Sequence, residues 1–128
     1  MKTLTMVIAS FFNLLAFGIA YAHGDHEATH GGVVGRGNDD IVVEFVVEKG
    51  TLNLYVHDEA GNSLDTKNIT GTLTVISRQG PAREVKLVSA GSDKLAAPGI
   101  EPVWGDKLRA RIKLPTGEEH ESAALFTK

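Results

Sequence analysis

The stretch Ile41-Val42-Val43-Glu44-Phe45-Val46-Val47-Glu48 decides the fold class of this chain, because β-branched and aromatic residues dominate it. Alternate apolar residues of this run share one face of an extended strand, namely Ile41, Val43, Phe45 and Val47. Lys49-Gly50 follows as a turn, and a second strand is expected where apolar and other residues alternate from Leu52 to His57. These two segments together predict a β-hairpin.

Further short strands are expected after the hairpin, separated by segments rich in the turn formers Gly, Pro, Asn and Asp. The strictest alternation lies at 107–114, where apolar residues alternate with Lys and Arg. The other expected strands are Thr72–Ser77, Ala82–Ser89, an edge piece at Lys94–Ala97, and Ser122–Phe126. Trp104 and Phe126 are expected to make contact and to close one end of the core.

A total of six to seven strands with turns between them predicts an all-β fold. We expect an antiparallel β-sandwich of the immunoglobulin-like kind, or a small barrel, over residues 41–128. Residues 23–40 precede it and are rich in Gly, His, Asp and Glu, with too few apolar side chains to fold alone. They are expected to form a mobile arm or a loop that a ligand orders.

The first 22 residues have the features of a secretory signal peptide. Lys2 supplies the positive start, Leu4 to Ile19 is mostly apolar, and Ala20-Tyr21-Ala22 matches the cleavage pattern, so cleavage is expected before His23. A retained membrane anchor is the alternative, but the apolar run is short for a full span. We therefore expect a periplasmic protein with no stable membrane insertion after cleavage.

Composition narrows the chemistry that this chain can carry out. The chain has no Cys, and its two Met residues, Met1 and Met6, both lie in the expected signal peptide, so a metal site would use nitrogen and oxygen ligands. The formal net charge of −3 argues against nucleic-acid binding. The chain contains no Gly-x-Ser-x-Gly motif and no phosphate-binding loop, so no enzymatic activity is expected.

Three of the five histidines gather in the arm, within the segment His23-Gly24-Asp25-His26-Glu27-Ala28-Thr29-His30. Imidazole nitrogen and carboxylate oxygen suit borderline divalent metals such as zinc, copper(II), nickel and cobalt. The candidate ligands are His23, Asp25, His26, Glu27 and His30, and a bound ion would order the arm. The alternative is a solvated polar segment that binds no metal.

The other two histidines lie beside acidic residues, His57 before Asp58 and His120 within Glu118-Glu119-His120-Glu121. If the arm folds back onto the domain, either imidazole would complete a site of four ligands. Otherwise each is a surface histidine with acidic neighbours. A histidine brace is a further alternative, in which an N-terminal His23 binds copper through its amine and ring, with His57 or His120 as the partner.

The basic residues of the strictest alternation would share one face of their strand, namely Lys107, Arg109, Arg111 and Lys113. Such a stripe is typical of a solvated sheet face, and it would also suit an acidic partner. An interaction module of the envelope with no metal role is therefore an alternative to metal binding.

Several segments together resemble a known family. They are His30-Gly31-Gly32-Val33-Val34, Val43-Glu44-Phe45-Val46-Val47, Leu52-x-Leu54-Tyr55-Val56-x-Asp58-x-x-Gly61, Val85-x-Leu87, Lys107-Leu108-Arg109-Ala110 and Leu114-Pro115-x-Gly117. This running pattern resembles the small N-terminal β-domain of periplasmic adaptor subunits in heavy-metal efflux pumps of the RND class, and related stand-alone secreted proteins.

The resemblance implies handling of divalent or copper ions in the envelope, with His30 as the motif position that carries over. The chain reaches Lys128 without the helical hairpin or lipoyl-like domain of an adaptor. We therefore expect a metal-binding accessory protein, which captures, buffers or delivers the ion, with a heavy-metal efflux adaptor or pump as its partner.

Overall fold

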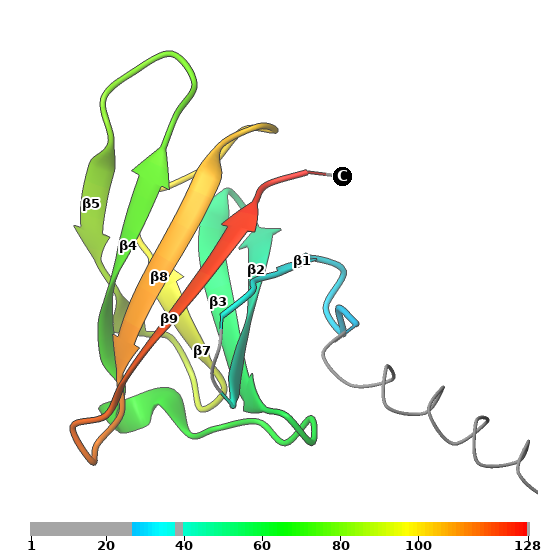
Figure 1. Cartoon of the computed structure of the whole chain (residues 1–128), viewed down its shortest axis with the longest axis vertical. Helices are drawn as coiled ribbons and strands as arrows, with labels where there is room; N and C mark the ends of the chain where they lie inside the picture. Colours follow the sequence, from blue (N-terminus) through cyan, green and yellow to red (C-terminus); the bar gives the residue numbers. More distant parts are fainter. Residues whose placement is uncertain (1–26, 38–39, 128) are drawn as a thin grey trace, which may run out of the picture.

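A computed structural model describes residues 27–37 and 40–127 of the chain as two antiparallel β-sheets that face each other (Figure 1). The five-stranded sheet has the order β1 (Val33–Val34), β2 (Ile41–Glu48), β3 (Thr51–Asp58), β7 (Lys94–Ala97) and β6 (Val88–Ser89). The four-stranded sheet has the order β5 (Arg83–Lys86), β4 (Thr70–Ile76), β8 (Lys107–Lys113) and β9 (Glu119–Leu125). The predicted β-sandwich is confirmed, and the small barrel is not formed.

The predicted hairpin is present as β2 and β3, which pair along their whole length with Phe45 opposite Leu54. Lys49 and Gly50 form its two-residue turn with φ angles of 53° and 76°. Two central residues with positive φ give the turn whose twist matches that of the flanking strands, which explains the glycine at the second position. The alternation predicted for β8 is also found: exposed and buried residues alternate along the whole strand.

The core lies between the sheets and is built from the inward-facing residues of both. Its fully buried large side chains come from five strands and include Phe45, Leu52, Leu54, Leu73, Leu95, Leu108 and Ile112. Phe126 belongs to this core, and Trp104 stacks on it with ring centroids 4.5 Å apart. The indole is itself half exposed, so it covers Phe126 at one end of the sandwich while staying in contact with solvent.

Two strand predictions differ from the structure. The single strand expected at Ala82–Ser89 is divided at Leu87: β5 joins the four-stranded sheet and β6 joins the other. Lys94–Ala97 is not an edge strand, because β3 and β6 flank it. A 3-10 helix, η3 (Thr66–Asn68), precedes β4, and in the described ranges no helix is long and apolar enough to cross a membrane.

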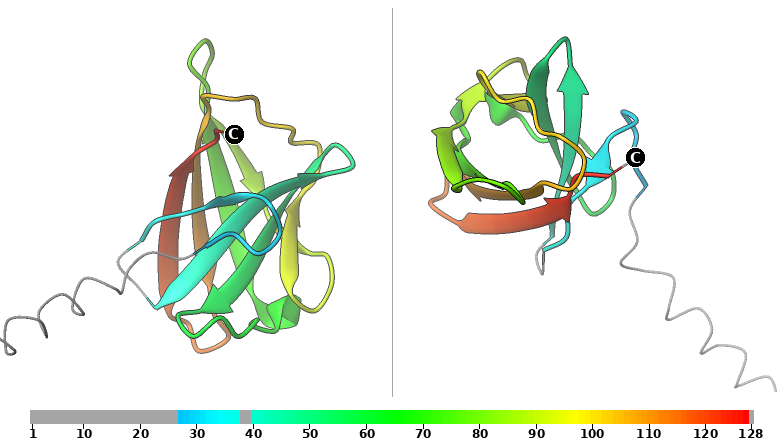
Figure 2. Two further views of the ribbon diagram at one scale, coloured as in Figure 1. Left: turned by 90° about the vertical axis from the view of Figure 1, so that its right-hand side faces the viewer. Right: turned by 90° about the horizontal axis from the view of Figure 1, so that it is seen from above.

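Residues 33–36 join the two sheets along one side, as the left view of Figure 2 shows for the cyan segment. Val33 and Val34 pair with β2, whereas Arg36 exchanges two backbone hydrogen bonds with Ala123 of β9, of 2.8 and 3.0 Å. We call residues 33–36 the clasp. Sheet pairing therefore begins at Val33, ahead of the domain boundary expected at residue 41.

Two glycines, Gly35 in the clasp and Gly37 just after it, lie where the backbone comes very close to β9. A Cβ added to Gly35 would lie 2.2 Å from Ser122 Oγ, and one added to Gly37 would lie 2.3 Å from the carbonyl oxygen of Glu121. Neither glycine has a positive φ, so close approach and not backbone flexibility explains both.

Candidate functional site

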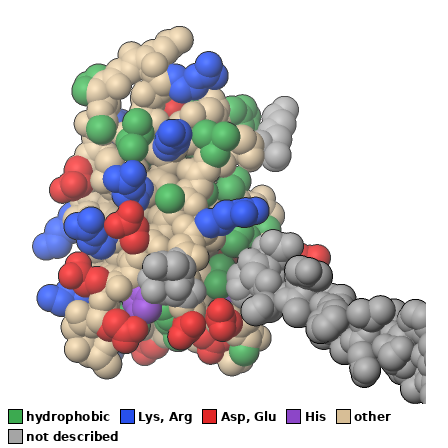
Figure 3. All heavy atoms as spheres, viewed as in Figure 1, with side chains coloured by type: hydrophobic (Ala, Val, Ile, Leu, Met, Phe, Trp, Pro, Cys, Tyr) green, Lys and Arg blue, Asp and Glu red, His purple; other side chains and the backbone are tan. Residues whose placement is uncertain are grey.

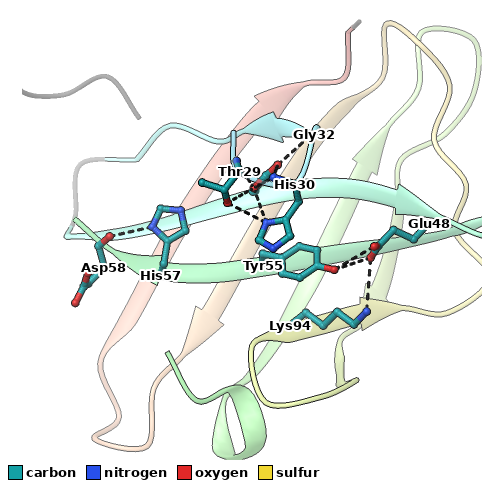
Figure 4. A network of polar contacts seen from close by, with 9 residues as sticks. Thr29, His30, Gly32, Glu48, Tyr55, His57, Asp58 and Lys94 are labelled. Atoms are coloured by element: carbon teal, nitrogen blue, oxygen red, sulfur yellow. Dashed lines mark hydrogen bonds and ion pairs between the residues drawn. The ribbon is translucent and has the colours of Figure 1, made fainter. Parts of the chain in front are cut away.

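The outer face of the β2–β3 hairpin is buried, although an outer sheet face usually contacts water. Glu44 is fully buried there, and Asn53, Tyr55 and His57 are 7–8% exposed. Part of the cover is the arm itself, which runs across this face before it enters the clasp (Figure 4). Both faces of the hairpin are therefore packed, and polar groups on the outer one need partners.

The buried Glu44 carboxylate finds its hydrogen-bond partners in the arm. Its carboxylate accepts hydrogen bonds from the backbone N–H groups of Thr29, His30 and Gly32, over 3.1, 2.9 and 2.8 Å (Figure 4). The Thr29 hydroxyl donates to the same carboxylate over 3.2 Å, and the His30 Nδ1 atom lies 3.0 Å from it. One buried side chain thus fixes the path of a whole turn of the arm.

These contacts decide the charge of Glu44. Burial by itself raises the pKa of this carboxyl, but the hydrogen bonds from Gly32, His30 and Thr29 outweigh it and hold the pKa below its usual range. The ionised carboxylate can only accept hydrogen bonds, so the neighbouring His30 Nδ1 must be the donor.

The His30 ring is fixed on two sides. It stacks on the Tyr55 ring with centroids 3.6 Å apart and an angle of 11° between the planes. Its Nδ1–H donates to Glu44, and its side chain is 37% exposed. In the neutral ring, a proton on Nδ1 leaves the lone pair on Nε2, which is the form that binds metal ions.

A second network of polar side chains, centred on Glu48, adjoins Tyr55 on the same face (Figure 4). The Tyr55 hydroxyl donates to Glu48 over 2.9 Å, Asn53 donates to it over 2.8 Å, and Lys94 Nζ lies 3.6 Å from it. The hydrogen bond from Tyr55 is the largest cause that lowers the pKa of Glu48. Burial, followed by the hydrogen bond to Glu48 and then by the Glu48 charge, raises the pKa of Tyr55. The Tyr55 ring, on which His30 stacks, is therefore held in place through its hydroxyl group.

A groove of about 940 Å³ lies next to His30. The arm from Ala28 to Val34 lines one part, and Val46 and Val47 of β2 line another. Residues 101–104 and Phe126 complete its lining. The groove leaves room for a small ligand or ion to approach the His30 ring.

The structure describes only some of the other predicted ligands, and it does not group those with His30. His23, Asp25 and His26 lie outside the described residues, and Glu27 is exposed at the start of the described arm. His57 and His120 are each 8% exposed, so the expectation that they are surface histidines is wrong. Within residues 27–37 and 40–127, no three His, Asp or Glu side chains are grouped so as to hold a metal ion.

The two buried histidines have local partners of their own. His57 Nδ1 lies 2.9 Å from the backbone oxygen of Asp58, and His120 Nε2 lies 2.9 Å from Glu118 Oε1. His57 is on the outer face of β3, two residues from Tyr55, whereas His120 belongs to β9 of the opposite sheet. Their role as metal ligands stays a prediction.

Glu44, the residue that organises this face, was not predicted from the sequence as a site residue. A lone carboxylate in a strand usually faces water, and Glu44 alternates with the core residues Val43 and Phe45 as a solvated residue would. The available signal was in its outer-face neighbours, because Val42 and Val46 are apolar on the same side. A strand that is apolar on both faces is typical of burial on both faces.

Comparison of the chain with models of known protein families, with curated proteins and with solved structures found no match. The resemblance to the N-terminal domain of efflux adaptors therefore stays a prediction. The contacts of His30, Glu44 and Tyr55 are the physical basis on which a function can be proposed.

Proposed function

We propose that this protein binds a divalent metal ion in the periplasm, using the His-rich segment 23–30 as its ligand source. The observation that supports this best is the pair formed by His30 and the buried Glu44 carboxylate. The pair fixes which ring nitrogen carries the proton and leaves the other for a ligand.

The His30–Glu44 pair has the chemistry of a metal ligand with its supporting residue. Histidines that bind metals commonly donate their other N–H to a carboxylate, which orients the ring and makes the binding nitrogen more basic. Glu44 accepts the Nδ1–H of His30, and Tyr55 stacks against the ring, so little motion of the ring remains to be lost on binding. His30 is also partly exposed beside a groove, which gives an ion access.

His30 needs further ligands, and the preceding residues offer them. His23, Asp25, His26 and Glu27 supply two imidazoles and two carboxylates within seven residues of it. A set of nitrogen and oxygen ligands favours copper(II), zinc, nickel or cobalt. The ion is cargo in this proposal: the protein captures and buffers it, or delivers it to a heavy-metal efflux adaptor or pump.

The test is calorimetric titration of protein secreted from its full coding sequence with each of the four metals. Binding of one ion per chain is expected, and replacement of His23, His26 and His30 by Ala should abolish it. Intact mass of the same sample shows whether His23 is the N-terminal residue and can add its amine as a ligand. Unchanged binding by the triple variant would exclude the proposed site.

A variant of Glu44 tests the supporting role separately. Glu44→Gln keeps all the proposed ligands but removes the carboxylate that His30 contacts, so metal affinity should fall about 10- to 100-fold. Glu121→Gln is the matched control, because Glu121 lies on β9 of the other sheet, where its side chain pairs with Arg109 and Arg111. Equal affinity of the two variants would show that Glu44 does not support metal binding through His30.

A further inference from the structure

We propose that one end of the sandwich, where β9 ends and β8 begins, docks reversibly on the surface of an anionic lipid bilayer. This inference does not depend on metal binding, because it uses none of the proposed ligands, although Val103 and Trp104 also line the groove beside His30. Three observations carry it: exposed apolar side chains, their rigid support, and the charges around them.

The exposed apolar side chains are concentrated at this end. Among the described residues, four large hydrophobic side chains are exposed, and three of them lie here: Val103 (64%), Trp104 (54%) and Leu125 (51%). The fourth, Val88, belongs to β6. We call Val103, Trp104 and Leu125 the apolar tip. Exposed apolar groups gathered in one place are typical of interaction sites.

The fold holds the apolar tip outward. Val103 N–H donates to the buried Asp106 carboxylate over 3.1 Å, and Asp106 N–H donates back to the Val103 oxygen over 3.1 Å. Gly105 and Phe126 are joined by a backbone hydrogen bond of 2.8 Å, and the indole of Trp104 stacks on the Phe126 ring. The tip therefore needs no rearrangement before it meets a surface.

Positive charges surround the apolar tip. Lys107 is opposite Leu125 in the β8–β9 register, and Arg109, which lies 3.5 Å from Glu121, follows it on the same face of β8. The exposed Arg78 lies over Gly105, since its Cδ is 3.2 Å from the position of a Cβ on that glycine. The carboxylates near Val103 are Asp106, which is buried, and Glu101, which is exposed.

The opposite end of the sandwich has the opposite character. It carries acidic residues where β3 ends and β9 begins, namely Asp40, Asp58, Glu59, Glu118 and Glu119. Figure 3 shows acidic side chains crowded at the lower end, with Lys or Arg and hydrophobic side chains at the upper end. This charge distribution would orient the protein with its apolar tip toward an anionic surface.

A bilayer fits this end better than a protein partner does. A stable protein interface buries about 800 Å² on each partner, which three side chains on a projecting end do not supply. A bilayer surface accepts a projecting group, and tryptophan prefers the boundary between headgroups and acyl chains. Lys and Arg beside it add attraction to anionic headgroups.

Trp104 makes a direct test possible, because it is the one tryptophan of the chain. Protein secreted from its full coding sequence is mixed with vesicles of phosphatidylglycerol and phosphatidylcholine, or of phosphatidylcholine alone. The mixed, anionic vesicles should shift Trp104 emission to shorter wavelength, and brominated lipids should quench it. Salt at about 1 M, where the Debye length is about 3 Å, should reverse the binding.

Variants and matched controls identify the docking residues. Lys107→Glu and Val103→Ser should each weaken vesicle binding about tenfold. Lys67→Glu in η3 and Val88→Ser in β6 change the same residue types elsewhere and should have no effect. Absence of the emission shift, equal binding by all four variants, or a shift seen only with periplasmic protein extract would each overturn the proposal.

Discussion

The outer faces of the two sheets differ in what a charged side chain does there. On the five-stranded sheet, Glu44 is fully buried and organises a turn of the arm through several hydrogen bonds. On the four-stranded sheet, Glu121 is 48% exposed and lies 3.5 and 3.4 Å from Arg109 and Arg111. Both are glutamates in the middle of a strand, and both have cationic or hydrogen-bond-donating partners.

This difference teaches that burial from water, and not the number of partners, sets how much a carboxylate in a strand contributes to stability. Water competes for Glu121 and its two arginines, so their attraction is weak. Water does not reach the Glu44 side chain, so removal of the carboxylate would take the acceptor from part-buried N–H groups of the arm. The four predictions below test this contrast, from the largest expected effect to the smallest.

Glu44→Gln should lower the free energy of unfolding by about 3 kcal/mol, because the amide NH2 group would face N–H donors of the arm. Glu121→Gln is the matched variant on the open face and should cost less than about 1 kcal/mol. Urea unfolding of both proteins at neutral pH measures the difference. Similar losses in the two variants would contradict the contrast between the faces.

Gly35→Ala should lower stability by about 2 kcal/mol, because its Cβ would lie 2.2 Å from Ser122 Oγ and 2.8 Å from the Phe45 ring. The clasp that joins the two sheets would have to shift. Gly80→Ala is the control, since nothing lies within 4 Å of a Cβ there, and it should change stability by less than about 0.5 kcal/mol. Equal thermal midpoints for the two variants would exclude close packing at Gly35.

Tyr55→Phe should cost about 1 kcal/mol and raise the pKa of Glu48 toward 4.5, since the hydrogen bond from the Tyr55 hydroxyl is the main cause of its low value. A carboxyl with a lowered pKa contributes stability above its ordinary pKa, and that contribution is lost as pH falls through the lowered value. The variant should therefore lose less stability on acidification below 4.5.

Carboxyl titration by NMR measures the Glu48 shift directly. Asp58 provides an internal control in the same spectra, because the backbone N–H of Asn62 is the main cause of its low pKa and Tyr55 is not among the causes. A Glu48 pKa that stays low in Tyr55→Phe would show that Asn53 and Lys94 suffice to hold it.

Arg111→Ala should change the free energy of unfolding by less than about 0.5 kcal/mol, because its 3.4 Å contact with Glu121 is exposed to water. Added salt should leave the difference from the unsubstituted protein near zero. A loss above about 1 kcal/mol would mean that the open face is more strongly coupled than its exposure suggests.

Period-two alternation was enough to predict the hairpin and β8, because one face of each meets a single core. It failed at Leu87, where the alternation continues through the point at which the chain passes from one sheet to the other. Pairing with strands distant in the sequence decides where the chain passes from one sheet to the other, and a local alternation pattern does not contain this information.

The candidate site was predicted in part for the same reason. His30 was identified from its position among histidines, but its partners Glu44 and Tyr55 come from two paired strands, where they are direct neighbours in the register. Composition indicated a mobile arm or a ligand-ordered loop over residues 23–40, and the part of it at residues 29–36 is held by hydrogen bonds to β2 and β9. Such contacts between distant segments depend on the assembled sheets.

The clasp also sets an order of events during synthesis. Arg36 leaves the ribosome long before its partner Ala123 in β9. The hairpin of β2 and β3 can close at once from neighbouring residues, while the clasp must wait until β9 has been made. The clasp is therefore locked after the hairpin, and the arm that carries His30 gains its final support only when β9 is in place.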